Sequence, residues 1–262
     1  MTTLKAQRAA GGLAVLLALA TGAAACGGGG GGGGSTEAGA GAKPAIDVGD
    51  GGHYKPAIDP ADFTTTIDNP YMPFAPGSVW EYVGKADGTT EHNRVEVTDK
   101  HRTVMGIPVV VVRDTVRVKG EITEDTYDWY AQDKEGNVWY LGEDTKEYDG
   151  DKVSTKGSWE AGVDGAQPGI VMPAQPRIGR AYRQEYLKGE AEDLAEITAV
   201  NDSRTVDGKP YDKVVVTKEW TPLDAKIVEA KWYAPGLGVI EEGTLTGGNE
   251  TSTLVSYTPG QA

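Results

Sequence analysis

The chain has 262 residues, of which 39 are acidic and 25 are basic, and its formal net charge at pH 7 is −14. An acidic excess of this size argues against binding nucleic acid or anionic lipid through a basic patch. The only cysteine, Cys26, excludes an intrachain disulfide and a zinc–thiolate cluster.

Residues 1–25 have the layout of a secretory signal peptide. Lys5 and Arg8 form a short basic region, and the apolar run 13–20 that follows is too short for a membrane-spanning helix. Small residues then lead into Cys26, a pattern that resembles a lipobox, although Ala23 stands where leucine is usual. We expect cleavage before Cys26 and lipidation of its sulfur. The alternative is an ordinary signal peptide followed by an incidental cysteine.

Lipidation of Cys26 predicts a protein attached to the outer face of the cell membrane. Two or more acyl chains, such as palmitate, hold a protein durably at a bilayer, whereas one holds it only marginally. Residues 26–62 are rich in glycine and alanine and lack a hydrophobic period, which indicates a flexible linker. About 36 such residues reach roughly 30–36 Å. Acylation of Cys26 also excludes cysteine catalysis.

The remaining residues, 63–262, predict a single all-β domain. β-branched and aromatic residues alternate with polar ones, and turn residues separate the runs. Segment 126–130 is expected to pair with 137–141 across the turn 133–136. The one candidate helix, 191–196, alternates well enough to be a strand. The other expected strands are 79–83, 94–98, 109–112 and 115–118.

Two segments of the domain, about 75–142 and 178–243, resemble each other. The sequence Trp-Tyr-Ala at Trp129 recurs at Trp232, and three upstream motifs recur in the same order at an offset of 100 to 104 residues. We interpret these halves as an internal duplication, with chance similarity between β-meanders as the alternative. Because neither half is large enough to bury both faces alone, we expect them to pack into one barrel or sandwich.

The segment 143–177 has no counterpart in the second half. It is long for a connection, and its apolar residues predict that it is ordered and packed. Its acidic run 143–151 misses the spacing of an EF-hand loop, which favours a plain acidic turn and leaves calcium binding open.

The stretch Asn69–Trp80 reads N-P-Y-M-P-F-A-P-G-S-V-W. It is similar to a motif, N-P-Y-F-P-L-x-P-G-x-x-W, of a family of uncharacterised bacterial secreted lipoproteins. Segments 159–169 and 232–239 also resemble this family. The resemblance implies one secreted domain and brings no established activity.

The aromatic residues suggest a site for a flat-faced ligand. The chain has 12 tyrosines and six tryptophans against two phenylalanines, and Tyr and Trp suit stacking on ligands as well as ordinary cross-strand pairs. We expect a small-molecule or glycan ligand where the unrepeated segment meets the Trp129 hairpin, because loops on a rigid sheet commonly carry sites. The candidate residues are Trp129, Trp139, Trp159, Glu160, Asp164, Gln167 and Trp232.

We therefore expect an envelope-anchored lipoprotein that acts as a ligand-binding or scaffolding module rather than an enzyme. No catalytic residue, metal site or cofactor is predicted, because no H-x-H, H-E-x-x-H, G-x-S-x-G, P-loop or dinucleotide motif is present. The alternative is a carbohydrate-active hydrolase that uses two carboxylates. Acidic residues are dense around 124–128, 143–144 and Glu160.

Overall fold

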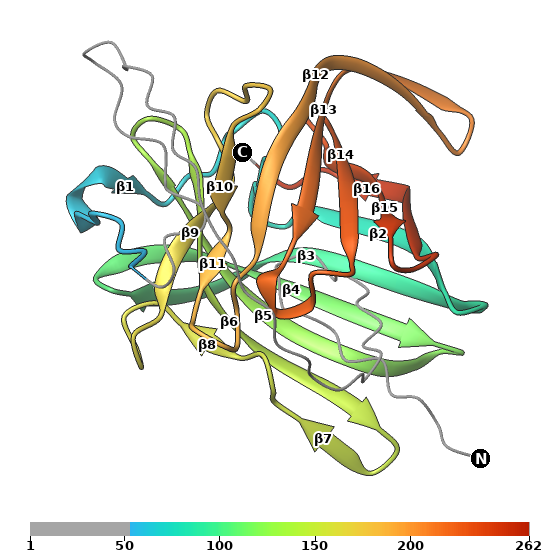
Figure 1. Ribbon diagram of the computed structural model, residues 1–262, viewed down its shortest axis with the longest axis horizontal. Helices are drawn as coiled ribbons and strands as arrows, with labels where there is room; N and C mark the ends of the chain where they lie inside the picture. Colours follow the sequence, from blue (N-terminus) through green and yellow to red (C-terminus); the bar gives the residue numbers. More distant parts are fainter. Residues whose placement is uncertain (1–52, 262) are drawn as a thin grey trace, which may run out of the picture.

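The computed structural model describes residues 53–261, which form one antiparallel sheet of sixteen strands and two short 3-10 turns. The sheet curves into a nearly closed barrel, as Figure 1 shows. The expectation of an all-β antiparallel fold is therefore confirmed. Across residues 53–261, no helix has the length and apolar character needed to cross a bilayer. Cys26 and its surroundings lie outside the described residues.

The first half of the sheet is a meander of long strands. Residues 109–112 and 115–118, which the sequence suggests as two strands, form one continuous strand. Tyr130 lies opposite Tyr140, which confirms the expected pairing of 126–130 with 137–141. The strands are β1 (Phe63–Thr64), β2 (Val79–Ala86), β3 (Thr89–Val104), β4 (Ile107–Val118), β5 (Glu121–Asp133) and β6 (Val138–Asp149).

The second half is also a meander, and its strands follow one another in the same order as β3–β6. Its first strand includes residues 194–196, so the candidate helix at 191–196 is a strand from Leu194 onward. The strands are β12 (Leu194–Val206), β13 (Lys209–Trp220), β14 (Val228–Ala234), β15 (Gly238–Thr246) and β16 (Thr251–Thr258). The shared order is what a duplication requires. Any meander shows it, so the duplication stays a prediction.

Short strands from the unrepeated segment and the residues after it join the two halves. These are β7 (Lys152–Ser154), β8 (Trp159–Glu160), β9 (Gln167–Met172), β10 (Ala181–Arg183) and β11 (Glu185–Tyr186). The β10–β11 stretch, Ala181–Tyr186, pairs with β12 at its first three residues and with β9 at its last two. We call this stretch the seam, because the two ends of the sheet meet there (Figure 1).

Four two-residue turns join the long strands, and each has glycine second. Asp87-Gly88 and Lys119-Gly120 have positive φ at both positions, as do Met105-Gly106 and Asp207-Gly208. This is the conformation of a type I′ turn, whose twist matches that of the flanking strands. The turns therefore set the register of the meanders.

The proline-rich motif 69–80 connects the hairpin turns of the two halves. Asn69 is buried, and its Nδ2 donates to the carbonyl of Gly136 at 2.9 Å in the β5–β6 turn. The carbonyl of Pro70 accepts from the N–H of Gly236 at 2.6 Å in the β14–β15 turn. Trp80 Nε1 donates to the carbonyl of Leu237 at 2.6 Å. The motif therefore has a structural role, holding both turns at one end of the barrel.

Gly142 lets β8 lie directly on β6. Its φ is +130°, and a Cβ at this position would collide with the carbonyl oxygen of Trp159 and approach Trp129. Glycine is therefore required here both for backbone conformation and for space.

Replacing Gly142 with alanine should destabilise the domain by about 3 kcal/mol, from backbone strain together with displacement of β8. Chemical denaturation followed by tryptophan fluorescence measures the loss. Gly150→Ala is the matched control, because Gly150 has a φ of +60° and open space around it. It should cost about 1 kcal/mol. Equal losses in the two variants would show that the approach of β8 is not constrained by Gly142.

Candidate functional site

Two of the sequence-predicted residues meet on the outer face of the first half. The Arg102 guanidinium on β3 lies 3.8 Å from the ring centroid of Trp129 on β5. Arg102 also forms an ion pair with Glu160 on β8. Trp129 is buried under this pair, whereas Glu160 is half-buried. The structure therefore brings Trp129 and Glu160 together through an arginine that the sequence did not single out.

The loop between β8 and β9 continues this outer surface. Asp164 is exposed and Gln167 half-buried, and the loop turns back through a hydrogen bond from the N–H of Gly162 to the carbonyl of Ala166. Met105 lies over Gly162, and Met105 and the neighbouring Val163 are 38% and 48% exposed. We call Arg102, Met105, Glu160, Val163 and Asp164 the outer patch. It combines an apolar centre with charged neighbours.

Trp159 lies in the core. It is 4% exposed and packs edge-on against Tyr140, with ring centroids 5.3 Å apart. A row of aromatic rings continues from Tyr140 to Tyr130, Phe74 and Trp80. These contacts are typical of core packing. The Trp159 side chain is therefore part of the hydrophobic core, whereas the next residue, Glu160, belongs to the outer patch.

Trp139 and Trp232 lie away from the outer patch. Trp139 is buried beside Phe63, and its Nε1 donates to Asp133 at 2.8 Å. Trp232 is on β14 in the second half, under the guanidinium of Arg204 at 4.2 Å. Arg204 in turn forms two hydrogen bonds of 2.7 Å with Glu241. The four tryptophans therefore do not line one groove.

Sequence reasoning missed a group of buried carboxyl groups, several of which lie on the inner face of the sheet. Within residues 53–261, nine acidic side chains are at most 9% exposed, against two basic ones, Lys231 and Arg183. The alternation of residues along neighbouring strands is the signal that could have found them. The acidic side chains are Glu91, Asp114, Glu124, Asp128, Asp133, Glu143, Glu185, Glu219 and Glu250.

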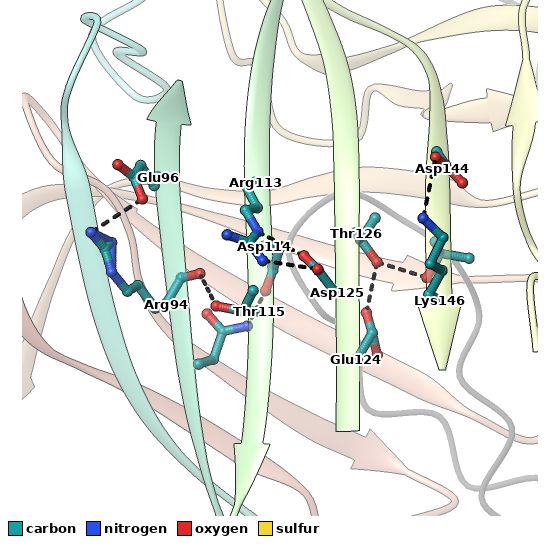
Figure 2. A network of polar contacts seen from close by, with 12 residues as sticks. Arg94, Glu96, Arg113, Asp114, Thr115, Glu124, Asp125, Thr126, Asp144 and Lys146 are labelled. Carbon is teal, nitrogen blue, oxygen red and sulfur yellow. Dashed lines mark hydrogen bonds and ion pairs between the residues drawn. The ribbon is translucent and has the colours of Figure 1, made fainter. Parts of the chain in front are cut away.

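Figure 2 shows how the two faces of β3–β6 differ. On the outer face Arg113 binds Asp125 through two hydrogen bonds of 2.7 and 2.8 Å. On the inner face Asp114 accepts from Asn93 at 2.6 Å, and Thr126 donates to Glu124 at 3.3 Å. The acidic residues drawn on the inner face thus have neutral amide or hydroxyl donors, whereas Asp125 on the outer face has a guanidinium.

In the second half a buried lysine compensates the interior charge. Lys231 Nζ lies 2.9 Å from Glu219 Oε2 and 3.6 Å from Glu242 Oε1. Burial alone would lower the pKa of Lys231, but the carboxylates of Glu219 and Glu242 raise it above its ordinary value. Burial raises the pKa of Glu242 to about 7 and that of Glu229 to about 9.

The corresponding part of the first half has an aspartate instead. Asp128 lies opposite Glu143 in the β5–β6 register, as Lys231 lies opposite Glu242 in β14–β15. Asp128 accepts a 2.7 Å hydrogen bond from Tyr140, whereas Oε1 of Glu143 is buried without a hydrogen-bond partner. Burial, followed by the charge of neighbouring carboxylates, raises the pKa of both Asp128 and Glu143.

The geometry limits the chemistry that these groups can perform. Over residues 53–261, no set of three or more His, Cys, Asp or Glu side chains is arranged to hold a metal ion. An apolar cavity lined by Phe74, Trp80 and Val239 has a volume of about 10 Å³, room for about one water molecule. Asp128 and Glu143 are 1% and 3% exposed, so a glycan cannot reach them in this conformation.

Comparisons with known proteins report structural neighbours at low similarity. No family model matches the chain, and no curated protein matches it. A Bacteroides fragilis protein described as exported, with a YmcC-like fold, has a TM-score of 0.42 and 15% identity over 72% of this chain and 99% of its own. A protein of Parabacteroides distasonis described as a lipoprotein has a TM-score of 0.38 and 12% identity over 74% of this chain and 100% of its own.

The buried carboxyl groups predict that stability decreases as pH rises. Raised pKa values mean that the folded chain binds more protons than the unfolded chain above about pH 4.5, so the stabilisation is present below that pH. It is lost as pH rises through about 7 for Asp193 and Glu242, and through about 9 for Glu229. The thermal midpoint should fall by at least about 5 °C between pH 5 and pH 9.

Thermal unfolding followed by circular dichroism at several pH values measures this decrease in the midpoint. Glu229→Gln should flatten the part of the curve between pH 7 and pH 9, since that group no longer titrates. Glu121→Gln, which changes an exposed carboxylate, is the control and should keep the wild-type slope. A midpoint that is constant or rises over this range would contradict the assignment of protonated carboxyl groups to the interior.

Proposed function

We propose that this protein is an envelope lipoprotein, anchored through Cys26, whose β domain acts as a scaffolding or ligand-binding module from its outer surface. The anchor rests on the signal-like residues 1–25 and the lipobox-like residues before Cys26. Residues 26–62 would separate the domain from the lipid headgroups. The two sister halves would form the rigid support on which the outer patch lies.

The observation that carries the proposal is the outer patch itself. Exposed apolar side chains at Met105 and Val163 stand beside the Arg102–Glu160 ion pair. An apolar centre with a charged rim is common in surfaces that bind another molecule. The ion pair also fixes the loop on the sheet, so a ligand would meet a preformed surface. Among the candidate residues, Glu160, Asp164 and Gln167 are available to a small molecule or glycan there.

The hydrolase alternative has less support from the geometry. Glycoside hydrolysis requires two carboxyl groups flanking an accessible bond. The cross-strand carboxyl pair Asp128 and Glu143 is buried, so a glycan has no access to it in this conformation. A binding role at the outer patch needs no such access.

The anchor predicts a change in membrane retention. Wild-type protein should fractionate with membranes, whereas Cys26→Ala should appear in the soluble fraction, because it lacks the sulfur that takes the diacylglycerol. Cell fractionation and mass spectrometry of the N-terminal peptide measure both. Ser35→Ala is a control in the same linker. Membrane retention of Cys26→Ala equal to that of wild type would refute the anchor.

The outer patch predicts a position-specific contact in cells. A photo-crosslinking phenylalanine analogue at position 163 should give a discrete adduct under light, because Val163 is exposed at the centre of the patch. The same analogue at position 245 is the control, since Leu245 is exposed on β15 in the other half. Adducts at position 245 without any at 163 would count against this surface.

A further inference from the structure

Few residue pairs hold the seam, and its β9–β11 pairing is shorter than the three pairs of β15–β16 or β6–β9. Three residue pairs hold β10 to β12 and two hold β11 to β9, whereas β3 and β4 share eleven pairs. Gly169 on β9 allows a close approach, because a Cβ there would collide with the backbone of Gln184. Closure of the barrel thus depends on a few backbone pairs at Ala181–Tyr186, the stretch labelled β10 and β11 in Figure 1.

A carboxyl group of the seam points into the interior. Glu185 on β11 is 1% exposed, and its Oε2 accepts a 3.0 Å hydrogen bond from Trp159 Nε1. The charges that act on it come from Asp193, in the connection to β12, and from Asp128 on β5. The charge of Glu185 in turn raises the pKa of Glu143 on β6. The seam therefore closes over a group of carboxyl groups from three other parts of the chain.

The remaining charged and titratable groups around this set come from every neighbouring element. The charges of Asp114 on β4 and Glu124 on β5 raise the pKa of Asp128. A hydrogen bond from Thr221 and the charge of Lys231 on β14 lower the pKa of Asp193, whereas the charge of Glu219 on β13 raises it. Tyr130 and Tyr140 are buried beside Asp128 and Glu143. The buried cation of the seam, Arg183, lies over the rings of Tyr186 and Tyr54.

The second half shows what this arrangement lacks. There Lys231 stands opposite Glu242 and supplies a positive charge. At the corresponding register position the first half has Asp128, opposite Glu143, whose Oε1 has no hydrogen-bond partner. Since a buried carboxylate without a cation is costly, Asp128, Glu143 and Glu185 are stable in the closed barrel only while they hold protons.

We propose that the seam is a pH-sensitive closure, which stays shut while Asp128, Glu143 and Glu185 are protonated and opens when they ionise, with the two meanders still folded. Ionisation places like charges on β5, β6 and β11, where the charges that act most strongly on Asp128, Glu143 and Glu185 are those of other carboxylates. Repulsion is relieved most easily where the fewest backbone pairs must break. Opening at β11 also releases Glu185 to water, which stabilises its charged form.

Hydrogen–deuterium exchange of the full chain tests this closure. Protection factors, corrected for the intrinsic rate at each pH, should fall at least tenfold between pH 5.5 and 8.5 in peptides covering residues 167–172 and 181–186. Peptides from β3–β4 and β12–β13 should remain better protected than the seam at pH 8.5. That difference distinguishes local opening from global unfolding.

Neutral variants identify the groups responsible. Glu185→Gln and Glu143→Gln remove one ionisable group each, and the change at the seam should shrink to less than threefold. Glu190→Gln alters an exposed carboxylate in the neighbouring turn and should behave as wild type. If Glu185→Gln does not fold, Glu143→Gln decides alone, because it leaves the hydrogen bond from Trp159 intact.

Two results would overturn the proposal. One is exchange of the seam together with β3–β4 at both pH values, which would mean that only global unfolding exposes it. The other is a wild-type pH dependence in every folded neutral variant. Neither result depends on the anchor or on the outer patch, so the proposed function would be unaffected.

Discussion

The structure depends on the closure of a single sheet on itself. Because the ends of the sheet meet at Ala181–Tyr186, the long strands turn one face inward. Closure also determines which residues lose contact with water. Alternate residues of β4, β5 and β6 point inward whether they are apolar or acidic, and their charges must then be compensated inside the barrel.

The two halves meet this requirement in different ways. In the second half an ammonium group, Lys231, is placed between Glu219 and Glu242. Breaking such a buried pair usually costs several kcal/mol, because the remaining charge has no partner. In the first half the corresponding residue is Asp128, so neutrality there requires protons bound to the carboxyl groups. The same backbone arrangement therefore surrounds its buried carboxyl groups with an ammonium group in one half and with other carboxyl groups in the other.

The sequence predicted the fold class, the hairpin 126–141 and the strand character of most of the domain, because alternation and turn residues act locally. Asp87-Gly88 and Lys119-Gly120 could be read directly as turns, since their geometry depends on two residues. The sequence alone could not show where Trp159 lies, because the burial of that ring depends on Gly142 and Tyr140. The aromatic composition allowed both cross-strand pairs and a ligand groove, and the structure distributes the four tryptophans over the core and two separate arginine contacts.

The interior carboxyl groups were hidden for a different reason. A strand residue shows from the sequence which neighbours share its face, but the identity of the facing strand comes only from the closed topology. Glu185 and Asp128 are 57 residues apart in the sequence, and the charge of Asp128 raises the pKa of Glu185 because the seam closes over β5 and β6. An acidic chain is normally assumed to carry its charge on a solvated surface, and that assumption fails for Asp128, Glu143 and Glu185.

Gly142 links the outer patch to this interior arrangement. In the second half an arginine covers a tryptophan and binds a carboxylate of the adjacent strand, namely Arg204, Trp232 and Glu241. In the first half Arg102 covers Trp129 in the same way, but Gly142 occupies the register position of Glu241. The missing side chain makes room for β8, which supplies Glu160 to the arginine and places Trp159 against the core. Because Trp159 in turn donates to Glu185, β8 connects the surface loop to the carboxyl group that closes the seam. The outer patch and the seam are therefore joined through one two-residue strand, whose Trp159 donates inward to Glu185 and whose Glu160 pairs outward with Arg102.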